Sequence, residues 1–190
     1  DAEVCKPLNG EKTMLELLSP AGSMEALRAA VQNGANAVYL GVGNLNARQS
    51  AKNFTPQTLV DAVKYCHVRG VDVHLTLNTL VSDREMKEAA ELIRHAAQYN
   101  IDAFIVQDLG VVQLCRQIAP HIPIHGSTQM TIHSLPGVQL CAAMGMKRVV
   151  LSRELSREEI RYICANSPIE IEVFAHGALC MSYSGQCYLS

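Results

Sequence analysis

The sequence predicts an α/β fold in which parallel strands are connected by helices. Short apolar runs alternate with segments of helical periodicity from residue 14 to the end of the chain. The repeat is about 25 residues, which is room for one strand and one crossover helix. No Asn-Gly pair joins two strand-like runs, as a hairpin would require. Two architectures fit these observations, an open doubly wound sheet and a (β/α)8 barrel.

The expected elements follow in order along the chain. Strands are expected at Met14–Leu18, Ala37–Leu40, Val71–Leu77, Ala103–Val106 and Val149–Leu151, and two more begin at Ile124 and Ile169. Six helices lie between them, and they are expected to begin at Ser23, Thr55-Pro56, Ser82 or Asp83, Leu109, Leu135 and Ser156. Ser156 with Glu159 has the spacing of a capping box, and Gly34, Gly70 and Gly145 are placed to end helices. No G-x-G-x-x-G follows the first strand, which counts against a dinucleotide-binding sheet.

Composition and charge limit the functional classes. The chain has 190 residues, of which 48% are hydrophobic and 18% charged, as in ordinary globular domains. Its net charge of -2 does not indicate the overall positive charge that is typical of nucleic-acid-binding domains. No apolar run approaches the roughly 18–20 residues that a membrane span needs. The seven cysteines are an odd number without a secretory signal, which favours a reduced, cytoplasmic compartment over a disulfide framework.

The most informative stretch is the end of the chain, I-E-V-F-A-H-G-A-L-C-M-S-Y-S-G-Q-C-Y-L-S. It begins as an alternating strand that His176 and Gly177 are expected to end. Cys180 and Cys187 follow on a loop rich in Gly and Ser, where small residues allow the backbone to approach a bulky group. Two thiols on such a loop are a candidate half of a metal or cluster site, although C-x6-C is not a common zinc spacing.

The same stretch resembles the signature of the family historically called peptidase U32. That family includes bacterial RNA hydroxylation proteins, paired proteins of oxygen-independent ubiquinone hydroxylation, and collagenase-like peptidases. Further similar motifs are E-L-L-S-P-A-G-S-M-E-A-L (16–27), V-Q-D-L-G (106–110), H-G-S-T-Q (125–129) and L-S-R-E-L-S (151–156). The resemblance covers nearly everything after Met14.

The resemblance implies a TIM-barrel-like fold. A full barrel has eight strands and about 250 residues, so seven strands predict an incomplete barrel, truncated at its C-terminus. We therefore expect a leader or linker at residues 1–13 and one barrel domain at residues 14–190. An incomplete barrel leaves strand edges unpaired, which predicts association with another chain.

The resemblance also implies a chemistry. Cys180 and Cys187 would be the first two of four thiolate ligands of a [4Fe–4S] cluster, with the other two beyond Ser190. The RNA-modifying relatives use prephenate, so RNA and a small carboxylic acid would be partners. Arg48, in the loop after the second strand, would bind a carboxylate or phosphate through two parallel hydrogen bonds from its guanidinium group.

Polar residues at the expected strand ends form the predicted pocket. In a barrel, the chemistry lies where strands end and βα loops begin. We expect His125, Ser127 and Gln129 to alternate along the fifth strand and so point to one face. Substrate binding is assigned to Arg48, Asn78, Gln107, Ser127 and Gln129, and the candidates for catalysis are His125, His176 and Gln129. The cysteines within helices, Cys66, Cys115, Cys141 and Cys164, are expected to be small core residues.

Two other functions stay open. A cysteine peptidase would pair a thiol with a histidine, and His176 or His125 is available for Cys180. No H-E-x-x-H or G-x-S-x-G supports another peptidase class. The third reading is a binding module without catalysis.

Overall fold

The computed structural model describes residues 15–43, 45–47, 53–177 and 180–187. These residues form two compact units, one of residues 16–124 and one from residue 125 onward. Arg48 and the predicted leader at residues 1–13 lie outside the described residues. None of the described helices has the length and apolar character that a bilayer crossing requires.

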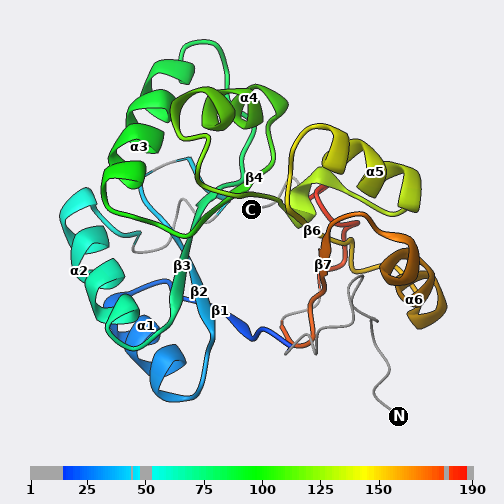
Figure 1. Ribbon diagram of the computed structural model, residues 1–190, viewed down its shortest axis with the longest axis horizontal. Coiled ribbons are helices and arrows are strands. Elements are labelled where there is room, and N and C mark those ends of the chain that lie inside the picture. The colour runs from blue at the N-terminus through cyan, green and yellow to red at the C-terminus, as the bar shows by residue number, and fades with distance from the viewer. Residues whose placement is uncertain (1–14, 44, 48–52, 178–179, 188–190) are drawn as a thin grey trace. The chain divides into compact units, whose positions relative to one another are not determined.

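The N-terminal unit contains four parallel strands in chain order. These are β1 (Leu18–Pro20), β2 (Ala37–Gly41), β3 (Asp72–Leu77) and β4 (Ala103–Val106), and each pairs with the next. Their crossover helices are α1 (Met24–Gln32), α2 (Pro56–His67) and α3 (Met86–Gln98), and α4 (Leu109–Ile118) follows β4. Figure 1 shows the helices of this unit on one face of its strands, as right-handed crossovers in sequential order require. The order excludes a doubly wound sheet here, because β1 would then lie inside the sheet.

The second unit continues the same pattern. It contains β5 (Ile124–Gly126), which begins at the boundary, β6 (Arg148–Val150) and β7 (Glu170–Glu172), paired in parallel and in order. The helices are the 3₁₀ turn η1 (Thr128–Met130), α5 (Leu135–Ala143) and α6 (Arg157–Asn166). The predicted alternation of strands and helices is confirmed in both units.

Buried side chains of the strands form the core. All four residues of β4 are buried, and so are five of the six in β3. Phe104 and Leu75 are fully buried. Leu27 is buried on α1, which packs against β1 and β2, and Leu59 is buried on α2, which packs against β3. Parallel strands that are covered by helices consist almost entirely of apolar residues. They can therefore be recognised in the sequence as short apolar runs.

Most helix boundaries follow the predicted caps. Ser156 and Glu159 form the expected capping box, and Ser23 caps α1. Gly34, Gly70 and Gly145 have positive φ angles of 90°, 68° and 85° just after their helices, a conformation that glycine adopts without strain.

Three predicted positions are wrong. Helix α3 begins at Met86 rather than at Ser82 or Asp83, because the Ser82 amide and hydroxyl donate to the Glu85 carboxylate and form a turn before it. The first strand is Leu18–Pro20, later than Met14–Leu18. Strand β7 ends at Glu172, so His176 lies beyond it in an irregular segment.

Candidate functional site

Strand ends of the N-terminal unit carry polar residues that hold loops in place. The Asn78 side-chain oxygen accepts a hydrogen bond from the Ala47 amide at 3.1 Å, which ties the loop after β2 to the end of β3. Asp108 caps α4 by accepting from the Gly110 and Val111 amides at 2.7 and 3.1 Å. Its second oxygen accepts from Val81 at 3.3 Å. Asn78 therefore positions the segment next to Arg48, in addition to its predicted contact with substrate.

Sequence reasoning missed one buried histidine of this unit. His74 is buried in the middle of β3 and lies beside Tyr39 of β2 in the register of the sheet. It shares a strand face with Thr76, whose hydroxyl donates to the Leu40 carbonyl at 3.0 Å, and that face leads to Asn78. The sequence signal for this face is the alternation of polar residues at His74, Thr76 and Asn78 within an apolar run.

The predicted residues of β5 are only partly arranged as expected. His125 lies in β5 and is 5% exposed, and Ser127 directly follows the strand and is 2% exposed. Gln129 was expected to alternate with them, and this placement is wrong. The strand ends at Gly126, and the Ser127 hydroxyl accepts from the Gln129 amide at 3.2 Å to begin η1. Gln129 is therefore on a 3₁₀ turn, while Gln107 lies just after β4 in the other unit.

The cysteine segment, residues 180–187, lies in the second unit. Cys180 is exposed and Cys187 is partly exposed, whereas Cys66, Cys115 and Cys141 are buried in helices as predicted. Cys164 was also expected in the core, and this prediction is wrong, because the residue is only partly buried on α6. The Ser182 amide donates to the Cys180 sulfur at 3.4 Å. Hydrogen bonds to the sulfurs are one of the features that set the reduction potential of iron–sulfur clusters.

The thiols fit one half of a four-thiolate site. Within the described parts of the chain, no group of three or more Cys, His, Asp or Glu side chains comes together to hold a metal ion. Two accessible thiols on one irregular segment match the donor chemistry of a cluster, and the remaining ligands would come from outside the described residues.

Burial makes the thiols of the helical cysteines in the core less reactive than the accessible thiols of Cys180 and Cys187. Burial raises the pKa of Cys66 to about 11, with a smaller contribution from the Asp102 charge, and raises the pKa of Cys115 to about 12. Burial also raises the pKa of Cys141. The reactive form is the thiolate, so these three side chains are both shielded and protonated at neutral pH.

Iodoacetamide at pH 8 is therefore expected to label Cys180 of the folded protein well before Cys66 or Cys115. At that pH, about one Cys66 thiol in a thousand is ionised, given a pKa about three units higher. Peptide mass spectrometry at successive times measures the order, and labelling in denaturant provides the control for complete access. Equal rates for Cys115 and Cys180 in the folded protein would contradict the assignment.

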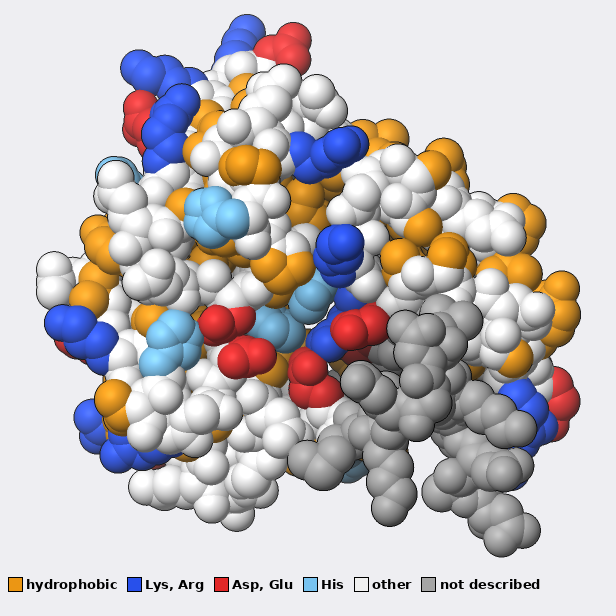
Figure 2. All heavy atoms as spheres, viewed as in Figure 1, with side chains coloured by type: hydrophobic (Ala, Val, Ile, Leu, Met, Phe, Trp, Pro, Cys, Tyr) orange, Lys and Arg blue, Asp and Glu red, His pale blue; other side chains and the backbone are white. Residues whose placement is uncertain are grey.

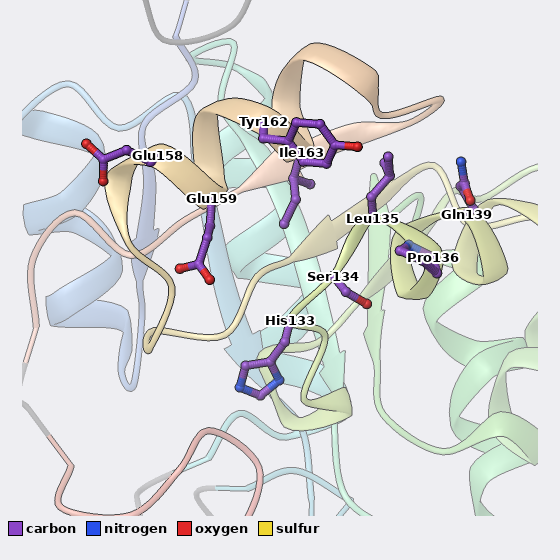
Figure 3. A pocket seen from close by; sticks show the side chains of 9 residues that line it. All are labelled: His133, Ser134, Leu135, Pro136, Gln139, Glu158, Glu159, Tyr162 and Ile163. Atoms are coloured by element: carbon purple, nitrogen blue, oxygen red, sulfur yellow. The ribbon is translucent and has the colours of Figure 1, made fainter.

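A separate cavity of about 540 Å³ lies between α5 and α6. Figure 3 shows its lining, which comes from the start of α5 and from α6: His133, Ser134, Leu135, Pro136, Gln139, Glu158, Glu159, Tyr162 and Ile163. None of the residues predicted from the sequence to form the site lines this cavity. The cavity and the predicted site are therefore different features.

Charged side chains give no concentrated basic surface on the face shown in Figure 2. Among the side chains coloured there, Lys and Arg are interspersed with Asp, Glu and uncharged residues. This agrees with the net charge of -2.

Comparisons with known proteins assign the family. The family model described as peptidase family U32 matches residues 22–190. The chain belongs to this family. As a U32 protein it also resembles the solved structure of the U32 peptidase Mk0906, with a TM-score of 0.69 and 14% identity over 91% of this chain and 73% of that one. This likeness confirms the predicted TIM-barrel-like class with parallel strands.

Relatives of this U32 chain have different names. It is 36% identical to the tRNA hydroxylation protein P1 of Bacillus subtilis (strain 168), covering 96% of this chain and 44% of that protein. It is 40% identical to the 23S rRNA 5-hydroxycytidine C2501 synthase of Escherichia coli (strain K12), covering 93% of this chain and 26% of that protein. It is 36% identical to a collagenase of Porphyromonas gingivalis (strain ATCC BAA-308 / W83), covering 92% of this chain and 44% of that protein. The chain thus spans less than half the length of these three relatives.

Proposed function

We propose that the protein to which this chain belongs supports hydroxylation of a base in tRNA or 23S rRNA. The observation that carries this proposal is the identity of 36–40% to proteins named for these two reactions, over 93–96% of the chain. RNA would be the macromolecular substrate, and the cytoplasm the compartment. Because the chain carries no overall positive charge, affinity for RNA would come from a local basic patch or from the rest of the protein.

In this proposal, the cysteine segment binds the cofactor. Cys180 and Cys187 would supply two of the four thiolates of a [4Fe–4S] cluster. When bound, such a cluster would supply electron transfer. The exposure of Cys180 and the amide hydrogen bond to its sulfur suit this ligand role.

In this proposal, the residues at the strand ends contact the substrate. We assign a small carboxylic acid such as prephenate to Arg48, which is the side-chain type that pairs best with carboxylates. Asn78 would set the position of the loop that carries Arg48 through its hydrogen bond to Ala47. We keep Gln107 in the N-terminal unit and, separately, Ser127 and Gln129 in the second unit as predicted substrate contacts, and His125 as a candidate for catalysis.

Peptidase activity is the second candidate. It is favoured by the relative named collagenase and by one local observation, that Cys180 and His176 are both exposed and only four residues apart. A cysteine peptidase needs a thiol within hydrogen-bonding reach of a histidine, so His176 would serve as the base.

Loss of the gene in the host organism is expected to remove one hydroxylated nucleoside from tRNA or from 23S rRNA. The two RNA classes are isolated separately, digested to nucleosides and compared by mass spectrometry. A plasmid copy of the wild-type gene should restore the modification, and a Cys180→Ala copy should not, because the cluster would lose a ligand. Unchanged nucleosides in both RNA classes after deletion would exclude the proposal.

A further inference from the structure

Ser184 is the one fully buried residue of the cysteine segment, with 0% exposure. Its hydroxyl donates to the Glu154 carboxylate at 3.1 Å and accepts from the backbone amide and the Nε of Arg153, both at 3.1 Å. Its amide donates to the same Glu154 oxygen at 2.9 Å. A serine hydroxyl has one donor and two acceptor positions, so every one is used.

A second group of contacts comes from the loop after β5. The Thr131 hydroxyl donates to the Ser184 carbonyl at 2.9 Å and accepts from the Gln186 side chain at 3.3 Å. Thr131 has a φ of 60°, a left-handed conformation that is unusual for a β-branched residue. This strain at Thr131 is offset by the contacts that its hydroxyl makes to the cysteine segment.

Glu154 is held as a carboxylate. Burial raises its pKa, but hydrogen bonds from the Ser184 amide and hydroxyl and the nearby His133 lower it by more, so the pKa lies below the ordinary 4.5. His133 Nε2 is 3.5 Å from the second Glu154 oxygen. Because the folded-state pKa is depressed, this stabilisation is complete above pH 4.5 and is lost only as the pH falls below it.

These contacts fix the middle of the segment between the two thiols. Ser184 lies four residues after Cys180 and three residues before Cys187. The partners come from the loops that follow β5 and β6, which are separated from Ser184 by 53 and 30–31 residues in the sequence. We call Thr131, Arg153, Glu154 and Ser184 the anchoring network.

We propose that the anchoring network is a positioning device that holds Cys180 and Cys187 in place for ligation before any cofactor binds. The proposal rests on the proposed function only for the identity of the ligand, an iron–sulfur cluster. Glu154 and Arg153 act through Ser184 on the thiols. Holding ligands in place in advance lowers the conformational entropy lost when a metal group binds.

The test compares Ser184→Ala and Glu154→Gln with the full-length wild-type protein. The matched controls are Ser182→Ala in the same segment and Glu158→Gln on the exposed start of α6. Hydrogen exchange of the metal-free proteins is measured for peptides covering residues 180–187 and, as a fold control, β3 and β4. Iron and acid-labile sulfide are then measured after anaerobic reconstitution.

Both anchoring variants are expected to speed exchange of residues 180–187 at least fivefold, to leave β3 and β4 unchanged, and to lower iron content. The controls should match the wild type. Unchanged exchange in both Ser184→Ala and Glu154→Gln would overturn the anchoring network. Faster exchange with full iron loading would overturn its positioning role. A wild-type protein that never binds iron would refute the proposed cofactor, while the exchange data would still decide whether the segment is anchored.

Discussion

Replacing Cys180 or Cys187 with alanine is expected to remove iron and acid-labile sulfide from the full-length protein purified without oxygen. Each change deletes one thiolate from a four-thiolate site, which removes one of the four bonds between the protein and the cluster. Both thiols are accessible, so neither substitution leaves a cavity in the core. The visible absorbance of the cluster should disappear together with the iron, while the circular dichroism of the fold stays unchanged.

Cys164→Ala is the matched control, because this cysteine is also partly exposed but lies on α6. It should retain wild-type iron and sulfide. Iron that survives both Cys180→Ala and Cys187→Ala would end the ligand assignment. Gelatin cleavage by iron-free protein that is lost in Cys180→Ala and in His176→Ala would favour the peptidase candidate instead.

The fold was predictable because its signals are local. Buried parallel strands appear as short apolar runs, and caps such as Ser156 with Glu159 depend on residues three positions apart. Two of the errors occur where a nearby side chain forms a hydrogen bond with the backbone. At α3, Glu85 binds Ser82 and delays the helix to Met86, and after β5, Ser127 begins a 3₁₀ turn that removes Gln129 from the strand.

The candidate site was predictable only in its outline. The two thiols and the small residues between them were visible as a motif, but nothing local indicated that Ser184 would be the buried member. Its partner Thr131 is 53 residues away and carries no motif of its own. Such a contact depends on tertiary packing, which sequence periodicity does not encode. Arg48, assigned from the resemblance, lies outside the described residues.

Gly185→Ala is expected to release the cysteine segment from the anchoring network. Gly185 has a φ of +76°, which costs a residue with a side chain roughly 1–2 kcal/mol. A Cβ there would lie 2.5 Å from the Gln129 carbonyl oxygen and closer still to the Thr131 hydroxyl, so backbone as well as side chain must move. Together these costs should speed hydrogen exchange at residues 180–187 about tenfold or more and lower iron loading in parallel.

Gly177→Ala provides the control for this prediction. Gly177 lies between β7 and the same segment, has no positive φ, and has open space where a Cβ would be added. Its substitution removes the same backbone freedom without a clash, so exchange and iron loading should stay at the wild-type level. Equal behaviour of Gly185→Ala and Gly177→Ala would show that close packing at Gly185 does not hold the thiols in place.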